Sequence, residues 1–261
     1  MTDNPNTELV ASPIPEIGKV TLHEILTSLK AGLWDFKRAP LYGVFFSAFY
    51  VVAGIILLWV GASTFLWTLA FSLGFPLVAP FAAVGFYEVS RRLEAEEPLD
   101  WSEIMGVVWQ ERRRQLPWIG VILAIVFLFW SFFAHMTFAL IMGVASLNVP
   151  HSWDFYLTAD GLMMAGIQAV VGAGVAFLVF GLTVVAIPLL VDKEIDFVTA
   201  MLVSLDTVSK NKFVMAVWAC IIAATLFLAM IPVFLGLFVA LPVLGHATWH
   251  LYRRALYHPV D

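Results

Sequence analysis

The sequence predicts an all-α integral membrane protein with six transmembrane helices, arranged as three hairpins that each follow an amphipathic helix at the cytoplasmic interface. Three observations support this fold class. The 261 residues are 61% hydrophobic and only 13% charged, whereas about 25% of residues are charged in a typical soluble domain. Long runs without charged residues recur along the chain. All 14 lysines and arginines fall before, between or after these runs.

The chain begins with a polar, proline-containing segment. We expect residues 1–20 to be disordered and cytoplasmic, and nothing in them resembles a signal peptide. The first apolar run starts near residue 41, so the first transmembrane helix is expected to target the chain. A single membrane domain is predicted over residues 21–254, followed by a short cytoplasmic tail over 255–261.

The transmembrane helices are predicted from run length, because a span needs about 20 apolar residues. The runs cover residues 41–61, 65–86, 116–144, 162–191 and 213–251. The last run is long enough for two spans. Pro232 and Gly236 predict a turn inside it, which gives helices at 213–230 and 233–251 and a total of six.

The placement of positive charge predicts the orientation. Four basic residues precede the first helix, five lie between the second and third, three lie between the fourth and fifth, and two follow the sixth. Lysine and arginine accumulate on the cytoplasmic side of membranes. Six helices place all 14 on that side together with both termini, whereas five helices would place Arg253 and Arg254 outside.

An amphipathic helix is predicted before each hairpin, and this recurrence indicates a pseudo-threefold internal repeat over about 21–92, 99–191 and 195–254. Each helix begins at a capping pair: Thr21 with Glu24, Asp100 with Glu103, and Asp196 with Thr199. The second helix of each hairpin contains proline and is expected to kink, at Pro76 and Pro80, Pro188, and Pro242.

Basic residues near the helix ends are the predicted contacts with anionic lipid headgroups or with a partner. They are Lys37, Arg38, Arg91, Arg92, Arg112, Arg113, Arg114, Arg253 and Arg254.

Two histidines could bind a metal ion or haem. His246 and His250 stand four residues apart and therefore share a helix face. A metal would need a further ligand, for which Glu88 and Asp192 are the candidates. In the alternative interpretation, both histidines lie at the headgroup level and form hydrogen bonds with loops or lipid.

No other pattern predicts a site. His135 lies well inside a span, where a hydroxyl such as that of Ser131 or Thr137 is the expected hydrogen-bond partner. We predict no catalytic residues, no cofactor and no nucleic-acid partner. Glycines of the fourth helix predict close helix packing, within the bundle or between two copies, and they are Gly166, Gly172, Gly174 and Gly181.

Residues 32–43, 85–94, 187–193, 199–204 and 245–253 resemble a proteobacterial family of uncharacterised integral membrane proteins, a domain of unknown function whose members are sometimes labelled cytochrome c oxidase proteins. The resemblance implies a bacterial inner-membrane protein and brings no catalytic residues. A haem–copper catalytic subunit needs more histidine ligands within its helices than this chain offers. Three of its six histidines, His23, His151 and His258, lie outside the predicted spans.

The expected function is therefore non-enzymatic. We predict an accessory, assembly or organising partner of a larger membrane complex, with a respiratory complex as one candidate. Two alternatives stay open. One is a transporter or channel for small molecules or lipids, whose pathway is lined by the second, fourth and sixth helices. The other is a metal- or haem-binding protein that uses His246 and His250.

Overall fold

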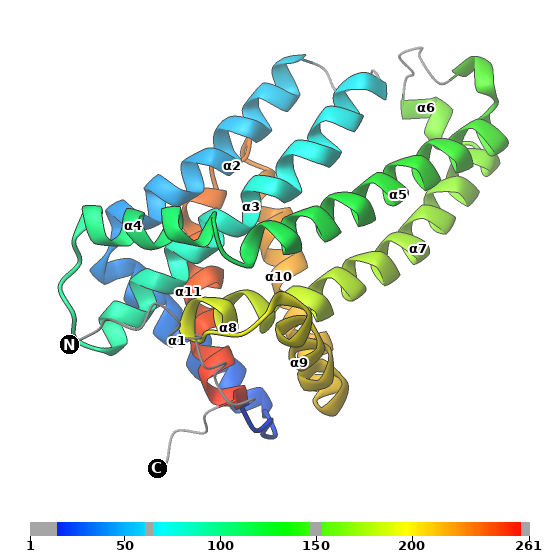
Figure 1. Cartoon of the computed structure of the whole chain (residues 1–261). Coiled ribbons are helices and arrows are strands. Elements are labelled where there is room, and N and C mark those ends of the chain that lie inside the picture. The colour runs from blue at the N-terminus through cyan, green and yellow to red at the C-terminus, as the bar shows by residue number, and fades with distance from the viewer. Residues whose placement is uncertain (1–14, 61–64, 147–152, 257–261) are drawn as a thin grey trace, which may run out of the picture.

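The computed structural model describes residues 15–60, 65–146 and 153–256. These residues form helices joined by short connections (Figure 1). The elements are α1 (Leu22–Arg38), α2 (Pro40–Val60), α3 (Phe65–Glu94), α4 (Trp101–Glu111), α5 (Leu116–Met142), a 3₁₀ turn (Val144–Ser146), α6 (Trp153–Tyr156), α7 (Ala159–Thr183), α8 (Ala186–Asp192), α9 (Phe197–Lys210), α10 (Lys212–Met230) and α11 (Leu237–Leu256).

Within the described residues, four helical stretches are long and apolar enough to cross a membrane: Pro40–Trp59, Leu116–Met142, Ala159–Asp192 and Lys212–Met230. Six spans therefore stay a prediction. Of the other two predicted spans, α11 is apolar only in its first half and carries histidine and arginine pairs in its second. Side chains in the first part of α3 lie outside the described residues.

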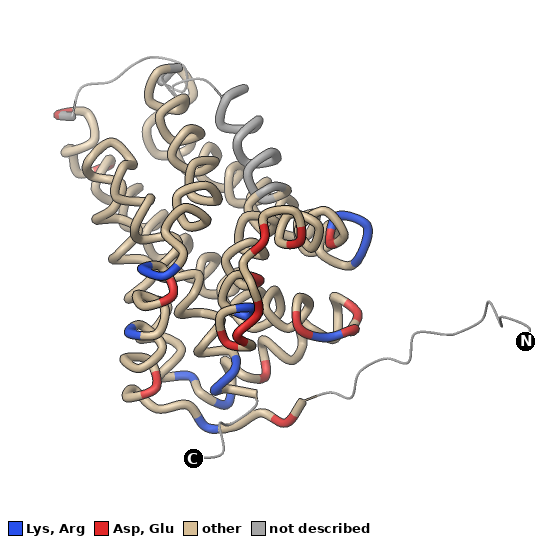
Figure 2. The backbone as a smooth tube through the Cα atoms, turned by 90° about the vertical axis from the view of Figure 1, so that its left-hand side faces the viewer, with Lys and Arg blue, Asp and Glu red and all other residues tan. Residues whose placement is uncertain are grey.

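Long helices that follow one another in the chain also pack side by side. In Figure 1, α2 lies beside α3 and α5 beside α7, and α10 contacts α11. The most extensive contact joins α1 to α11, which are far apart in the sequence. Figure 2 shows the lysines and arginines gathered away from the end of the molecule at which α2 and α5 end and α7 begins. The orientation in the membrane and the internal repeat stay proposals.

The three amphipathic helices begin at the predicted caps. The Thr21 hydroxyl and the Glu24 carboxylate form a reciprocal capping box in α1. Asp100 accepts hydrogen bonds from the first backbone N–H groups of α4, and Asp196 does the same for α9. These bonds satisfy donors that a helix N-terminus otherwise leaves unpaired.

Helix α1 presents apolar side chains on a face that points away from the protein. Its buried face consists of Ile25 and three small or polar residues, Ser28, Gly32 and Asp35. Leu22, Leu26, Leu33 and Trp34 are all exposed. Helix α4 repeats this arrangement, because Ile104 is buried while Trp101, Met105 and Trp109 are exposed. Such helices suit the interface of a bilayer, with one face on protein and another on lipid.

The fourth predicted span is interrupted between α7 and α8. Pro188 cannot continue the backbone hydrogen-bond ladder, and the helix breaks just before it. The Ser204 hydroxyl of α9 donates to the Gly181 carbonyl at 2.7 Å and accepts from the Val185 N–H at 3.1 Å. It therefore bridges the two backbone groups that a continuous helix would join. By contrast, α3 continues through Pro80 and α11 through Pro242.

The predicted division of the last apolar run agrees with the structure. Residues 231–236 form the turn between α10 and α11. Val233 and Phe234 adopt left-handed φ angles of 53° and 64°. At Gly236 a Cβ atom would lie 2.6 Å from the Ala229 carbonyl oxygen, so only glycine fits there without a shift of the backbone.

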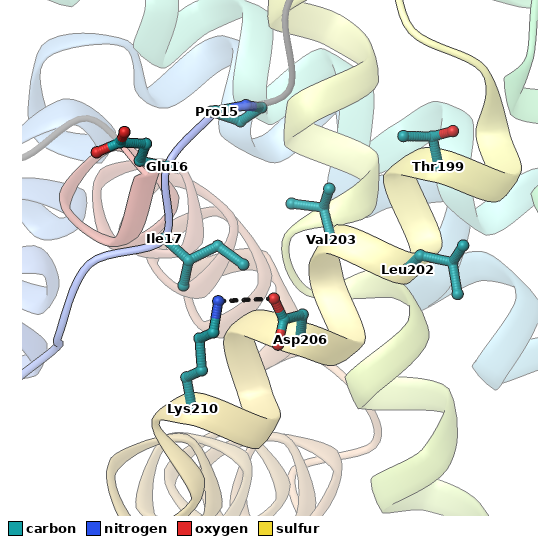
Figure 3. Close-up of a pocket in the computed structure, with 8 residues that line it drawn as sticks. All are labelled: Pro15, Glu16, Ile17, Thr199, Leu202, Val203, Asp206 and Lys210. Atoms are coloured by element: carbon teal, nitrogen blue, oxygen red, sulfur yellow. Dashed lines mark ion pairs between the residues drawn. The ribbon is translucent and has the colours of Figure 1, made fainter.

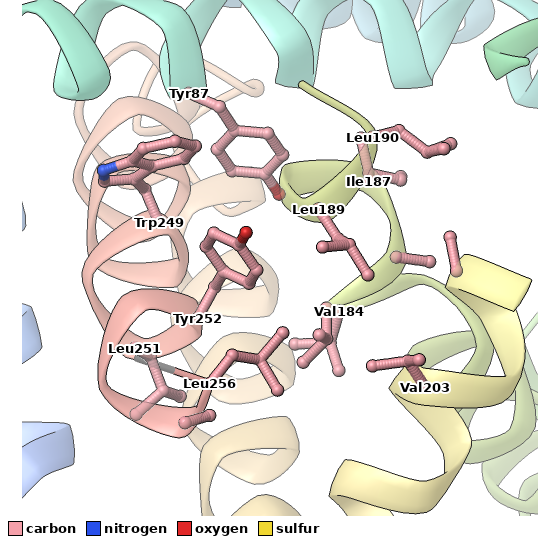
Figure 4. Packing of buried hydrophobic residues seen from close by; sticks show 14 of the residues in the cluster. Tyr87, Val184, Ile187, Leu189, Leu190, Val203, Trp249, Leu251, Tyr252 and Leu256 are labelled. Carbon is pink, nitrogen blue, oxygen red and sulfur yellow. The ribbon is translucent and has the colours of Figure 1, made fainter. Parts of the chain in front are cut away.

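The largest apolar cluster lies where α3, α8, α9 and α11 meet. Figure 4 shows Tyr87 of α3 and Tyr252 of α11 facing Leu189 of α8, with Trp249 of α11 beside Tyr87. The Tyr252 hydroxyl donates to Asp192 Oδ2 at 2.8 Å. Large aromatic side chains dominate the energetics of such a core, and their polar atoms need partners.

Residues 15–20 run as an extended segment along the ends of α9 and α11. The Asn211 side chain accepts from the Val20 N–H at 2.8 Å and donates to the Gly18 carbonyl at 3.0 Å. The Gly18 N–H donates to the Ala255 carbonyl at 2.8 Å. An open groove of about 820 Å³ lies between residues 15–17 and α9, beside the Asp206–Lys210 ion pair (Figure 3).

Candidate functional site at the junction of α1, α3 and α11

Asp35 of α1 is the centre of a buried polar junction. Its carboxylate is 5% exposed, and Oδ2 accepts from the Ser90 hydroxyl at 2.9 Å and from His250 Nε2 at 2.7 Å. Ser90 belongs to α3 and His250 to α11, so one carboxylate oxygen joins three helices. Hydrogen bonds to a charged acceptor are the stronger kind.

His246 is completely buried beside this carboxylate. Its Nδ1 lies 2.8 Å from the Ser90 hydroxyl oxygen and 3.1 Å from the Phe86 carbonyl oxygen. A carbonyl can only accept, so Nδ1 carries the proton and the Ser90 hydroxyl is left free to donate to Asp35. The other ring nitrogen, Nε2, is buried without a hydrogen-bond partner among the described residues.

Glycine allows α1 to approach α11 closely enough for these bonds. A Cβ atom on Gly32 would lie 2.5 Å from both the Ala247 nitrogen and the Val243 carbonyl oxygen. On the other side of α11, a Cβ on Gly245 would lie 2.8 Å from the Phe86 ring. The backbone contact at Gly32 therefore places Asp35 within reach of the histidine side chains.

A second group of charges lies at the end of α3. Glu88 is 1% exposed and pairs with Arg91 Nε at 2.8 Å and with Arg92 Nε at 2.7 Å. The hydrogen bond with Glu88 is the main cause that raises the pKa of Arg91. Arg92 also pairs with Glu103 and donates to the Pro98 carbonyl at 3.1 Å. These contacts hold α4 and its preceding loop against α3.

The two carboxylates predicted as further metal ligands have other partners. Glu88 is bound to the two arginines, and Asp192 accepts from Tyr252 and lies 3.7 Å from Arg253 Nη1. Within the part of the chain that the structure describes, no group of three or more His, Cys, Asp or Glu side chains could hold a metal ion. Metal or haem binding stays a prediction that this geometry does not favour.

The nine predicted basic contacts divide into two groups. Arg91, Arg92, Arg114 and Arg253 pair with carboxylates. No carboxylate partner is found among the described residues for Lys37, Arg38, Arg112, Arg113 or Arg254, and Arg112 lies 3.6 Å from the centre of the Trp109 ring.

Arg114 pairs with Glu111 at 2.7 Å and also with Glu194, which links α4 to the segment after α8. Burial raises the pKa of the Glu111 carboxyl, and Arg114 opposes this effect. Within the described residues, the predicted contacts that have no carboxylate partner are therefore those that close α1 and α4, together with Arg254 of α11.

His135 of α5 forms a hydrogen bond with a backbone carbonyl and not with the hydroxyl that the sequence led us to expect. Its Nδ1 lies 2.7 Å from the backbone carbonyl of Ser131, so the ring nitrogen donates to the backbone. The hydroxyl of Thr137 donates to backbone carbonyls of its own helix and accepts from Gln168 of α7. The glycines of α7 differ in whether they contact another helix. Gly172 contacts Trp130, whereas a Cβ added to Gly166 would have nothing within 4 Å.

Sequence reasoning missed Asp35 and Ser90. Asp35 follows Ser28 and Gly32 at helical spacing, so it lies with them on the face of α1 that carries small and polar residues. That face, opposite a row of leucines, was the signal that could have indicated a buried acid in contact with another helix.

The comparison with known proteins indicates an integral membrane protein. Residues 68–192 match the family model of a predicted integral membrane protein, DUF2189. The chain is an integral membrane protein of unknown function. The match covers part of α3, all of α4 to α8, and the residues Glu88, Arg91 and Arg92. It confirms the resemblance to a family of uncharacterised membrane proteins. No curated protein and no solved structure shows a significant match.

Proposed function

We propose that this protein is non-enzymatic and acts as an accessory, assembly or organising partner of a larger membrane complex in the bacterial inner membrane. One observation supports this most. The polar side chains that converge at the junction of α1, α3 and α11 are bonded mainly to one another, and all but His250 are buried. They stabilise the position of α1 against α3 and α11, which is a structural role.

The surface formed by α1 and α4 is suited to the lipid headgroup layer. Helices α1 and α4 expose leucine, methionine and tryptophan side chains on one side. Their C-terminal ends carry Lys37 and Arg38, and Arg112 and Arg113, which have no carboxylate partner among the described residues. Apolar side chains beside free cations favour anionic lipid at the cytoplasmic surface, where both termini would lie.

Purification from native membranes in mild detergent tests the proposal. We expect a reproducible set of membrane proteins to co-purify in fixed proportion with the wild-type chain. Replacing the four unpaired cations of α1 and α4 by glutamine should weaken that association. Lys210→Gln, which neutralises a cation already paired with Asp206, serves as the control. Recovery of the protein alone, from several mild detergents, would remove the basis of the proposal.

Transport is the second candidate, and the break between α7 and α8 favours it. Interrupted helices form substrate sites in many transporters because they free backbone groups. Here Ser204 already occupies the two groups at the break. Flux of small molecules or lipids in liposomes that contain the purified protein would support this candidate, and liposomes without flux would count against it.

Metal or haem binding is the third candidate, because His246 Nε2 has no partner among the described residues. Elemental analysis and absorbance of the purified protein test it directly. Bound metal that disappears in the His246→Ala, His250→Ala double variant would support it. Native protein without metal or haem would exclude it.

A further inference from the structure

A narrow apolar groove runs between α5 and α7, two helices that are long and apolar enough to cross the membrane. Its volume is about 430 Å³. Phe127 and Trp130 of α5 form one wall, and Gln168, Gly172, Ala176 and Val179 of α7 lie along the other. A Cβ atom on Gly172 would lie 2.7 Å from the Trp130 ring, so glycine makes room for that side chain.

The shape of the groove matches a single hydrocarbon chain. From Gln168 to Val179 the helix rises about 16 Å. Spread over that length, the volume corresponds to a cross-section of about 26 Å². An extended acyl chain is narrow enough to lie within it.

Gln168 is the polar residue at one end of the groove, and its amide has a fixed orientation. Nε2 donates to the Ala134 carbonyl at 3.0 Å and to the Thr137 hydroxyl at 2.9 Å. The carbonyl can only accept, and the Thr137 hydroxyl already donates to backbone carbonyls. Both amide hydrogens are therefore used, and Oε1 is an acceptor without a donor among the described residues.

The depth of Gln168 restricts which donors can reach it. Trp118, at the start of α5, is 56% exposed and suits one membrane interface. Thr137, which binds Gln168, lies about 28 Å further along α5, close to the thickness of the hydrocarbon core. Measured from Trp118, Gln168 is therefore near the opposite boundary, closer to the headgroups than the predicted spans 116–144 and 162–191 imply.

We propose that the groove between α5 and α7 binds one acyl chain of a membrane lipid whose headgroup carries a hydrogen-bond donor, a hydroxyl or an ammonium group, and that this donor binds Gln168 Oε1. The lipid belongs to the leaflet opposite the basic residues, and its chain runs from Gln168 towards Val179. An unpaired amide oxygen at the edge of hydrocarbon is costly, and this donor satisfies it.

Trp130 provides a direct readout, because brominated acyl chains quench the fluorescence of a tryptophan that they touch. The protein is reconstituted in phosphatidylcholine vesicles that contain dibrominated phosphatidylethanolamine, which has an ammonium donor, or dibrominated phosphatidylcholine, which has none. The Trp130 signal is the difference between wild type and Trp130→Phe. We expect the donor-bearing lipid to bind about fivefold more tightly, as one net hydrogen bond allows.

Three variants separate the site from ordinary boundary lipid. Gln168→Leu should abolish the preference between the two lipids. Ala176→Phe should fill the groove and abolish the quenching of Trp130 by both. Ala173→Phe, on an exposed face of the same helix outside the groove, should behave as wild type.

Equal quenching by both lipids in the wild type would overturn the proposal, as would a preference that persists in Gln168→Leu. If that variant does not fold, unchanged quenching in Ala176→Phe overturns it instead. None of these results depends on whether a protein partner exists.

Discussion

Asp35 Oδ2 lies 2.7 Å from His250 Nε2, although the two residues are 215 positions apart in the chain. The bond joins the first helix of the chain to the last. Because Ser90 of α3 donates to the same oxygen, a single buried atom fixes the relative position of three helices. The stability of this end of the protein should therefore respond strongly to a change at Asp35.

Asp35→Ala should lower the free energy of unfolding by about 2 kcal/mol, because it leaves the buried Ser90 hydroxyl and the partly buried His250 imidazole without their acceptor. Thermal or denaturant unfolding in one detergent measures the change. Asp206→Ala is the control, since Asp206 forms an exposed ion pair with Lys210, and its cost should stay below about 0.5 kcal/mol. Similar losses in the two variants would show that the junction is not a centre of stability.

Ser204→Ala should destabilise the break between α7 and α8. The variant leaves the Val185 N–H and the Gly181 carbonyl without their shared partner, at a cost of about 1–3 kcal/mol. Faster hydrogen exchange at the Val185 amide is the local readout. Ser209→Ala on the exposed side of the same helix should change neither measurement. Unaltered exchange at Val185 in Ser204→Ala would contradict the bridging role.

Two glycine-to-alanine substitutions should change the free energy of unfolding in opposite directions. Gly32→Ala places a methyl group against backbone atoms of α11 that cannot move aside, and should cost about 1–3 kcal/mol. Gly106→Ala in α4 meets nothing within 4 Å and should stabilise the protein by about 0.5–1 kcal/mol, because alanine favours the helix. The unfolding midpoints of both variants, compared with that of the wild type, test this prediction. An unchanged midpoint in Gly32→Ala would exclude the close approach of α1 to α11.

Acid should loosen the start of α9. Hydrogen bonds from Thr199 lower the pKa of Asp196 below its ordinary value of 3.8. A carboxylate with a depressed pKa contributes stability above its unfolded pKa and loses it as the pH falls through the folded pKa. Hydrogen exchange at the Thr199 amide, corrected for its intrinsic pH dependence, should therefore lose protection below about pH 4. Asp196→Asn keeps a cap without the charge and should flatten this dependence.

The helices were predictable because their signals are local. Capping residues, charge-free runs and Pro232 with Gly236 mark their ends in the sequence, and the structure places helix boundaries close to those positions. The spacing of His246 and His250 likewise predicted that both lie on one face of a helix.

The partners of those histidines were not predictable from local spacing. Asp35 and Ser90 arrive from helices that are distant in the sequence, and only the packing of α1 against α11 brings them together. Glu88 illustrates the reverse case. The sequence offers it as one candidate for a further metal ligand, although arginines three and four residues away on its own helix bind it.

The contact of α1 with α11 also sets an order of events during synthesis. A chain folds from its N-terminus as it leaves the ribosome, and contacts between distant segments form late. Helix α1 is made long before His246 and His250, because Asp35 and His250 are 215 positions apart. The same holds for Gly18, whose N–H binds the Ala255 carbonyl. The face of α1 with Gly32 and Asp35 can therefore contact Ser90 of α3 early, but it must wait for its contact with α11 until His250, 215 positions beyond Asp35, has been made.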